Sequence, residues 1–137
     1  MGLVASVHVS VLSTVFAKEV LASPQLPKLL TLSATKLVET YTILTTALKA
    51  TGIEYFPSCA TVFVLARLAP HAATWDEEIL ALRAYMQAGV AIVPGRAYHM
   101  PEGQKGWMRV TFAVSNEDLA EGIRRIKKVY LSLLAGI

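Results

Sequence analysis

The sequence predicts an α+β fold in which a small sheet of about three strands packs against helices, and three observations support this prediction. Apolar residues recur at three- and four-residue steps near both ends of the chain, which indicates amphipathic helices. Between them the pattern changes to short alternating or continuous apolar runs, which indicates strands. The composition fits a folded domain, because 54% of the 137 residues are apolar and only 17% are charged.

Two helices are predicted at the N-terminal end. The first covers about residues 3–22, although a buried strand competes for its first half because valine is a mediocre helix former. Ser23 and Pro24 suit the start of a second helix, which extends over about residues 24–50 and stops at Gly52. This helix is longer than a small core requires, so we expect it to bridge to a second body.

The next two predicted elements are a strand and a helix. The clearest strand covers residues 61–67, where the run is continuously apolar. Thr74 then opens a helix, because it forms a capping-box pattern with Glu77, three residues later. The apolar positions of this helix continue to Gly89, which ends it.

The last third of the chain predicts two more strands and a final helix. A short buried strand is expected over residues 90–93, a loop over 96–106 and a strand over 108–113. Ser115 can cap the last helix, whose first turn is acidic and therefore complements the helix dipole. The buried stripe of this helix is predicted to contain Leu119, Ile123, Ile126, Tyr130 and Leu133.

The mean hydropathy of +0.48 requires either a membrane segment or a surface that another body covers. The longest apolar stretch, residues 2–17, is too short and too rich in Ser, Thr and His to span a bilayer. No positive charge precedes it, as a signal peptide would require. We therefore expect no membrane partner, and a surface that is normally covered.

Cysteine, histidine and charge exclude several other classes of protein. Cys59 is the sole cysteine and cannot form an internal disulfide, so we expect a reducing, cytoplasmic location. The three histidines are scattered, which is unfavourable for a metal site. A net charge of +3 is too small to indicate nucleic-acid binding.

Four short segments carry a resemblance to a known family. They are Gly-Ile-Glu at 52–54, Ala-Thr-Val-Phe at 60–63, Gly-Val-Ala-Ile-Val-Pro-Gly at 89–95 and Gly-Trp-Met-Arg-Val-Thr-Phe-Ala at 106–113. Their order and spacing resemble the C-terminal, small-domain part of class I/II aminotransferases, which are fold-type-I pyridoxal-phosphate (PLP) enzymes. The Tyr98-His99-Met100 run looks like the 1-aminocyclopropane-1-carboxylate synthase-like branch.

The resemblance implies a substrate-binding role for Arg109. In this family the arginine of the Gly-Trp-x-Arg segment binds the α-carboxylate of the substrate, and the motif match places it at Arg109. The chemistry is suitable, because a guanidinium offers two parallel donors to the two oxygens of a carboxylate and stays charged. Without the motif, a surface arginine paired with a local acid would be the ordinary interpretation.

Three further residues are candidates for lining the substrate pocket. Thr61 stands where the synthase-like branch has glycine, so it would narrow the pocket or change what fits. Arg96 could line the substrate entrance, although a solvated loop charge is the more common role. His99 could touch the substrate or lie exposed on the loop.

The part of the family that holds the cofactor is not matched by this chain. In the family a lysine in a Ser/Thr-x-Ser-Lys setting forms the Schiff base with PLP, and no lysine here has that setting. We therefore assign no catalytic residue and expect no tight PLP binding by this chain alone. The predicted organisation is a helical segment over residues 1–52 followed by an aminotransferase small domain over 53–137.

Two functional hypotheses follow. In the first, the chain is the C-terminal portion of a PLP-dependent transaminase or synthase-like lyase that acts on an amino acid, and a missing large domain or partner chain completes the site. In the second, it is a non-catalytic interaction module that uses its apolar helices to bind a partner or to form a homodimer. The reading frame upstream of Met1 would distinguish them.

Overall fold

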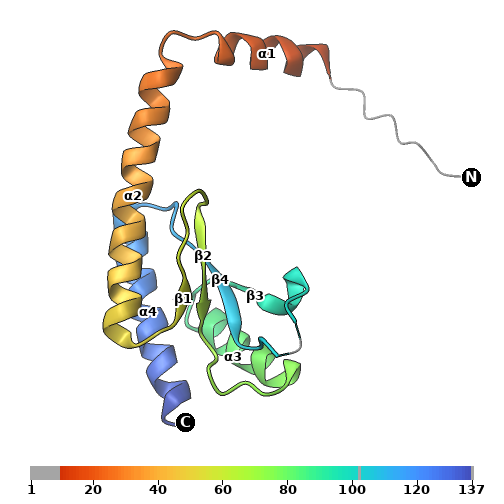
Figure 1. Cartoon of the computed structure of the whole chain (residues 1–137), viewed down its shortest axis with the longest axis vertical. Coiled ribbons are helices and arrows are strands. Elements are labelled where there is room, and N and C mark those ends of the chain that lie inside the picture. The colour runs from red at the N-terminus through yellow and green to blue at the C-terminus, as the bar shows by residue number, and fades with distance from the viewer. Residues whose placement is uncertain (1–9, 102, 137) are drawn as a thin grey trace, which may run out of the picture. The chain divides into compact units, whose positions relative to one another are not determined.

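A computed structural model describes residues 10–101 and 103–136 (Figure 1). The helices and strands, in chain order, are α1 (Val11–Leu21), α2 (Leu26–Thr51), β1 (Tyr55–Phe56), β2 (Phe63–Arg67), α3 (Trp75–Gln87), β3 (Val93–Pro94), the 3₁₀ helix η1 (Gly95–Tyr98), β4 (Trp107–Thr111) and α4 (Asn116–Leu134). The predicted α+β fold is confirmed. The chain divides into two compact units, residues 1–36 and 37–137.

The first unit contains α1 and the beginning of α2. The helix expected over residues 3–22 is present as α1, and the part of that expectation at residues 3–9 lies outside the described residues. No residue of α1 is buried. The Ser23 hydroxyl accepts a hydrogen bond from the Gln25 N–H at 3.3 Å, just before α2 begins. Among the described residues, no helix is long and apolar enough to cross a membrane.

The sheet lies in the second unit and is antiparallel, with strand order β1-β2-β4-β3. In the register, Arg109 of β4 lies opposite Leu65 of β2 on one side and Val93 of β3 on the other. The structure adds a fourth strand, β1, to the three that were expected. A two-residue strand is too short to show an alternating pattern in the sequence.

The strand expected over residues 90–93 is wrong by about three residues, because β3 is formed by Val93 and Pro94. Val90 and Ile92 are buried, which explains the apolar signal, but they precede the strand. Pro94 lacks a backbone N–H and is tolerated here because β3 is an edge strand.

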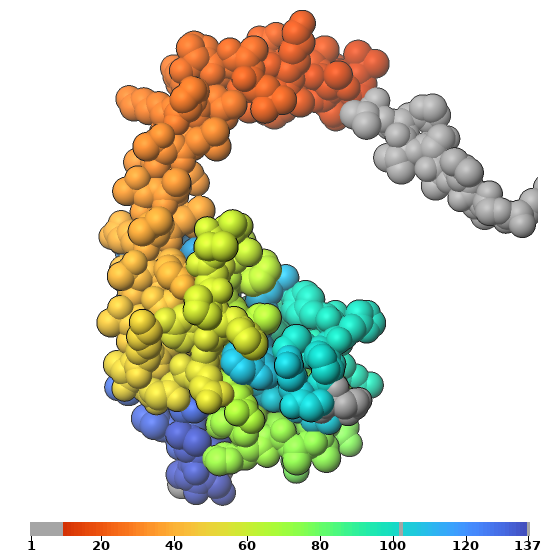
Figure 2. All heavy atoms as spheres, in the orientation of Figure 1, coloured from red at the N-terminus to blue at the C-terminus, as the bar shows by residue number. Residues whose placement is uncertain are grey.

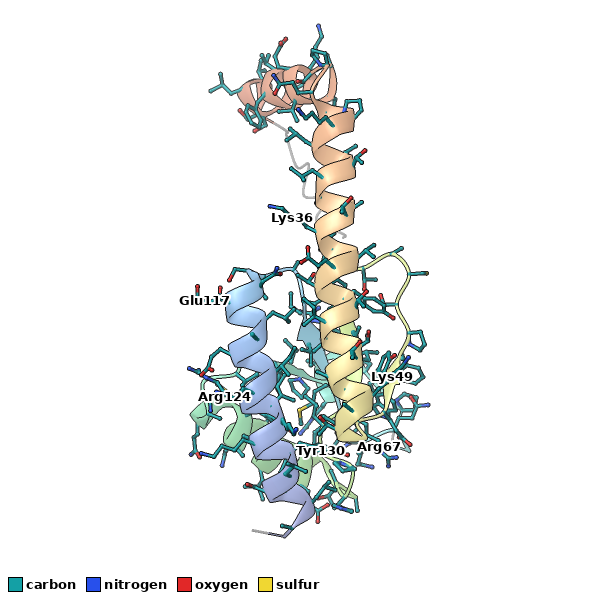
Figure 3. The ribbon with its side chains drawn as sticks, turned by 90° about the vertical axis from the view of Figure 1, so that its left-hand side faces the viewer. Lys36, Lys49, Arg67, Glu117, Arg124 and Tyr130 are labelled. Atoms are coloured by element: carbon teal, nitrogen blue, oxygen red, sulfur yellow. The ribbon has the colours of Figure 1, made fainter. Side chains whose placement is uncertain are left out.

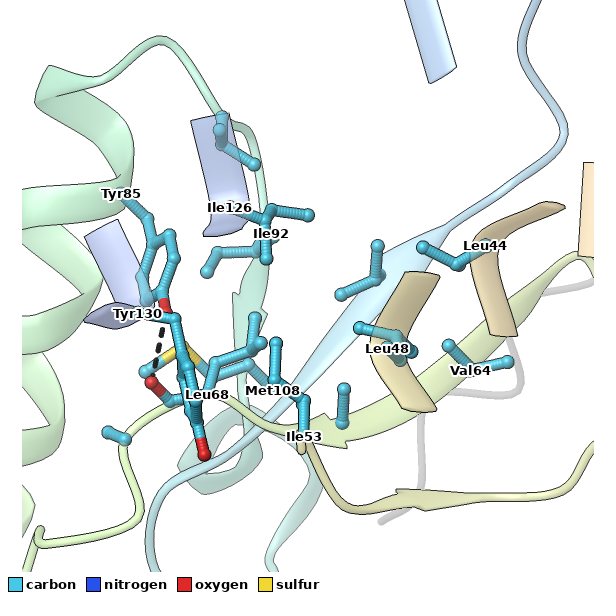
Figure 4. Close-up of a cluster of buried hydrophobic side chains, with 14 of the residues drawn as sticks. Leu44, Leu48, Ile53, Val64, Leu68, Tyr85, Ile92, Met108, Ile126 and Tyr130 are labelled. Carbon is cyan, nitrogen blue, oxygen red and sulfur yellow. Dashed lines mark hydrogen bonds between the residues drawn. The ribbon is translucent and has the colours of Figure 1, made fainter. Parts of the chain in front are cut away.

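Helices cover one face of this sheet, and the core lies between them (Figure 4). Alternate residues of β2 and β4 face this core, and Val64, Ala66, Met108 and Val110 are all buried. The core also contains Tyr85 of α3, whose hydroxyl donates to the Leu68 carbonyl oxygen at 3.0 Å. The expected stripe of α4 is confirmed, with Leu119, Ile126 and Tyr130 buried and Ile123 and Leu133 partly buried.

Helix ends follow the capping signals of the sequence. Thr74 forms the expected capping box with Glu77, and the backbone N–H groups of Ala73 and Thr74 lower the pKa of the Glu77 carboxyl. Ser115 caps α4 by accepting from the Asp118 N–H at 3.1 Å. Within the second unit, α4 lies beside the C-terminal half of α2 (Figure 3).

Candidate functional site

The sheet face that points away from the helical core carries the candidate site. Strand alternation places Phe63 and Leu65 of β2 and Trp107 and Arg109 of β4 on this face, and all four are half-buried. Phe56 of β1 extends the aromatic surface, because its ring stacks on Trp107 with the ring centroids 4.4 Å apart. Figure 2 shows the blue atoms of β4 between the yellow-green atoms of the segment leading into β2 and the turquoise atoms of η1.

The guanidinium of Arg109 lies close to two aromatic rings on this face. Its central carbon is 4.9 Å from the centroid of the Phe63 ring and 4.7 Å from that of the Tyr98 ring. A cation this close to the face of an aromatic ring is attracted by the ring quadrupole, by about 0.5–1 kcal/mol at an exposed site. The two rings come from different elements, since Phe63 belongs to β2 and Tyr98 to η1.

Arg109 has no hydrogen bond or ion pair within the part of the chain that the structure describes, and its Nε atom is buried without a partner. The ordinary interpretation, an arginine paired with a local acid, therefore does not describe it. It describes Arg67 instead, which lies on β2 and pairs with Glu54 at 3.2 Å. The Nη groups of Arg109 therefore have no partner among the described residues and can donate to a ligand that carries negative charge.

Arg67 and its acid form a separate group at the other end of β2. Arg67 Nη2 also donates to the Pro70 carbonyl oxygen at 3.4 Å. The Tyr130 hydroxyl of α4 interacts electrostatically with the charges of Glu54 and Arg67 (Figure 3). Burial raises the pKa of Tyr130, Glu54 raises this pKa further, and Arg67 opposes the shift.

The segment that carries Tyr98 is held by Glu78, a residue that the sequence analysis missed. Glu78 belongs to α3 and is fully buried. Its Oε1 atom accepts from the Arg96 N–H at 3.3 Å, and its Oε2 atom accepts from the Gly106 N–H at 2.8 Å. One carboxylate thus joins the start of η1 to the residue before β4. A signal existed, because Glu78 shares the spacing of the buried Ala81 and Tyr85.

The predicted pocket residues have different surroundings. Thr61 is exposed, and its hydroxyl oxygen is 2.6 Å from both the Ser58 hydroxyl and the Phe63 carbonyl oxygen, two residues before a ring that contacts Arg109. Arg96 and His99 are exposed on η1 and at its C-terminal cap. Within the described part of the chain, neither side chain forms a hydrogen bond or an ion pair. The structure instead brings Tyr98, which lies between them in sequence, to the guanidinium.

We also searched the described residues for a cavity and for a cluster of metal-binding side chains near Arg109. A hollow of about 380 Å³ lies on the helical side of the sheet, lined by residues that include Val110, Ile123 and Arg125, and Arg109 does not line it. No group of three or more His, Cys, Asp or Glu residues that could hold a metal occurs among residues 10–101 and 103–136. The arrangement around Arg109 is suited to binding an anion, because it holds a half-buried cation that lacks an acidic partner among the described residues.

Comparison with known proteins identifies similar sequences. The family model described as "Aminotransferase class I and II" matches residues 2–126. The probable aminotransferase aclI of Aspergillus oryzae is 41% identical over 129 residues, which cover 94% of this chain and 31% of that protein. The probable aminotransferase gliI of Aspergillus fumigatus is 37% identical over 84 residues, which cover 56% of this chain and 19% of that protein.

Solved structures show the same fold in part of longer chains. A tetra mutant of Thermus thermophilus aspartate aminotransferase complexed with tryptophan aligns with a TM-score of 0.67 and 24% identity, covering 82% of this chain and 28% of that one. The aromatic aminotransferase of Pyrococcus horikoshii aligns with the same TM-score and 20% identity, covering 82% and 29%. The chain thus spans less than a third of the length of these proteins.

Proposed function

Because the chain belongs to the class I and II aminotransferase family, whose members depend on PLP, we propose that it is the part that binds the α-carboxylate of an amino-acid substrate. In this proposal Arg109 holds the carboxylate, and a large domain or a partner chain supplies the cofactor site. The reaction is amino transfer or a lyase step of the kind carried out by the 1-aminocyclopropane-1-carboxylate synthase-like branch. Residues 53–137 form the small domain, and residues 1–52 connect it to the rest of the enzyme.

One observation carries this proposal: the Arg109 guanidinium lies against two aromatic rings but has no acidic partner among the described residues. A half-buried cation without a counter-ion retains only part of its hydration and gains most from an anionic ligand. Arg109 also lies on β4, a central strand that is paired on both sides, so its backbone is rigidly placed. A carboxylate matches it, because both groups are planar and present two atoms in parallel.

The residues around Arg109 do not fit PLP itself. The groups that contact the guanidinium are the rings of Phe63 and Tyr98, and neither offers an amine for a Schiff base or a cradle for a phosphate. Lys105 lies with its amine 5.1 Å from the ring of Trp75, a residue of α3. In our proposal the lysine and the phosphate site come from outside this chain, and the chain alone does not turn over an amino acid.

The branch assignment and the pocket remain part of the same proposal. Exposed His99 lies next to Tyr98 and would meet the substrate entrance from η1. Thr61 and Arg96 would approach the substrate from the segments that flank the two rings. The cytoplasmic location rests on the single, exposed Cys59, which is suited to a reducing compartment.

A chimeric enzyme tests the proposal. The chain replaces the matching segment of the Aspergillus oryzae relative, and the amino-acid half-reaction is followed by stopped-flow absorbance. Arg109→Leu is expected to lower kcat/KM by at least about 30-fold, because removing one partner of a desolvated, hydrogen-bonded charge pair costs about 2 kcal/mol or more. Arg109→Lys keeps the charge but loses the planar fork, so an intermediate loss is expected.

Arg67→Leu is the matched control for this experiment. Arg67 lies on the neighbouring strand and is also half-buried, but its charge is already paired with Glu54. Its loss should leave kcat/KM close to that of the unsubstituted chimera, because it removes an internal ion pair that contributes about 0–1 kcal/mol to stability rather than a contact with the substrate. Equal effects of Arg109→Leu and Arg67→Leu would contradict a carboxylate-binding role for Arg109.

A second candidate function is favoured by one feature of the first unit. Three apolar side chains of α1, those of Val11, Leu12 and Phe16, are each more than 70% exposed. A chain made alone could use this surface as an interaction module, either with a partner or with a second copy as a homodimer. Sedimentation of the 137-residue chain over a range of concentrations would detect self-association, and removal of residues 1–22 should abolish it.

A further inference from the structure

Tyr98 is the less firmly attached of the two rings that hold Arg109. The Phe63 ring projects from the first residue of β2, which pairs with Thr111 of β4, so the sheet fixes the position of its backbone. Tyr98 lies in a single turn of 3₁₀ helix and is 39% exposed. The position of the second ring therefore depends on whatever anchors η1.

The anchor of η1 is the buried carboxylate of Glu78. It accepts hydrogen bonds from the backbone N–H groups of Arg96, within η1, and of Gly106, immediately before β4. Both ends of the segment that carries Tyr98 are thereby tied to α3, an element on the other side of the sheet from Arg109. A buried carboxylate with two N–H donors is held strongly, because losing either donor would leave its charge poorly compensated.

Close packing fixes the same segment from the other direction. A Cβ atom built on Gly95 would lie 2.8 Å from the Trp107 carbonyl oxygen, so the start of η1 touches the backbone of β4. The Met100 N–H closes the turn by donating to the Gly95 carbonyl oxygen at 3.3 Å. The Tyr98 ring consequently has a defined place over the guanidinium.

We propose that Tyr98 and Glu78 are positioning residues for Arg109: the Tyr98 ring packs against the guanidinium and restricts its orientation, and Glu78 sets the position of that ring by anchoring η1. This inference rests on the proposed function of Arg109 as the carboxylate-binding group. With two rings against the guanidinium and Nε buried, the two Nη groups are the donors left for a ligand. Two parallel N–H donors match the two oxygens of a carboxylate, which is the geometry of bidentate binding.

The proposal is tested on the whole 137-residue chain by NMR of the Arg109 side chain, with acetate as the probe and chloride at equal ionic strength as the control. Protons over the face of an aromatic ring resonate upfield, so the chemical shifts of the Arg109 side chain report the stacking directly. A change in overall stability alone would not move these chemical shifts. Their movement on titration gives the dissociation constant for acetate. Arg109→Gln assigns the signals and shows how much of the binding depends on the guanidinium.

Tyr98→Leu removes the ring, and Tyr98→Phe keeps it as the matched control. Tyr98→Leu is expected to move the Arg109 signals downfield and to raise the acetate dissociation constant about two- to fivefold, the fold-change that corresponds to one cation–π contact at an exposed site. Tyr98→Phe should leave the Arg109 signals and the acetate dissociation constant unchanged, because the Tyr98 hydroxyl makes no hydrogen bond within the described chain.

Glu78→Gln replaces one acceptor oxygen by an N–H₂ group, which cannot accept a backbone N–H. As with Tyr98→Leu, the Arg109 signals should move downfield and the acetate dissociation constant should rise. Asp76→Asn, which makes the same charge change at an exposed position of the same helix, should produce neither. If the Glu78→Gln chain does not fold, Glu78 is a general stabilising residue and its positioning role is wrong.

The outcomes separate this inference from the function on which it rests. If Arg109→Gln abolishes acetate binding while Tyr98→Leu binds as tightly as the wild type, the positioning role is overturned and the proposed function stands. If acetate moves the Arg109 signals no more than chloride does, the proposed function fails, and the positioning inference fails with it.

Discussion

Gly106 is the residue at which the fold is expected to tolerate substitution least. Its φ is +84°, and a Cβ atom there would lie 2.0 Å from the Ala69 carbonyl oxygen, which is backbone and cannot rotate away. Gly106→Ala therefore adds about 1–2 kcal/mol of left-handed strain and requires the two segments to separate. Separation threatens the bond from the Gly106 N–H to the buried Glu78 carboxylate, worth about 1.5–3 kcal/mol, and the bond from Ala69 to Gly106, worth about 0.5–1.5 kcal/mol.

The expected loss of unfolding free energy for Gly106→Ala is about 3–6 kcal/mol, much of the stability of a small domain. Gly52→Ala is the matched control, since Gly52 has a φ of +75° but nothing within 4 Å of its added Cβ. That variant should lose only about 1–2 kcal/mol of unfolding free energy, the cost of placing alanine in the left-handed region. Urea unfolding followed by circular dichroism measures both. A Gly106→Ala variant no less stable than Gly52→Ala would refute the argument that close backbone approach requires glycine here.

Three further outcomes are expected. Tyr85→Phe should lower the unfolding free energy by about 1–2 kcal/mol, because the Leu68 carbonyl oxygen loses its buried donor. Burial raises the pKa of Tyr85 above its usual 10.0, so wild-type stability should fall as pH rises above 10, and less steeply in Tyr85→Phe by pH-dependent denaturation. NMR titration should place the pKa of the Glu121 carboxyl at about 2, because hydrogen bonds from the Arg124 side chain, followed by those from Arg125, lower it. The ion pair between Glu121 and Arg124 should therefore weaken as pH falls from 4.5 towards 2, and Arg124→Gln should raise the pKa of Glu121. Thr74→Ala, measured by thermal unfolding, should cost about 1 kcal/mol as its cap is lost.

The helices of this chain could be predicted from the sequence because their signals are local. A helix start depends on a cap and its partner three residues later, and Thr74 and Ser115 both cap as expected. The strands were less accurate, because pairing depends on distant residues. Val90 and Ile92 gave a strand signal through burial alone, whereas β3 forms only where Val93 and Pro94 can pair with β4.

The candidate site was only partly predictable, for the same reason. A motif placed Arg109 as a binding residue, but what surrounds it depends on contacts between segments that are far apart in sequence. Tyr98 reaches Arg109 from a loop, and no local pattern distinguishes it from Arg96 or His99 on either side. Glu78 could have been found, since an acidic residue in the buried stripe of a helix needs donors, and backbone N–H groups of loops, which have no partner within a helix or sheet, are the natural candidates.

The high apolar content of the sequence, which predicted a covered surface, is explained by exposed apolar side chains that are concentrated in the N-terminal helices. Ten of the nineteen large apolar side chains that are exposed in the described part lie between residues 11 and 38, in α1 and the first half of α2. The second unit, in contrast, buries a continuous core of its own. A helix with no buried residue gains nothing from packing, and short isolated helices are marginal in water. In the proposed function, the body that supplies the cofactor also covers the exposed apolar side chains of α1 and of the first half of α2.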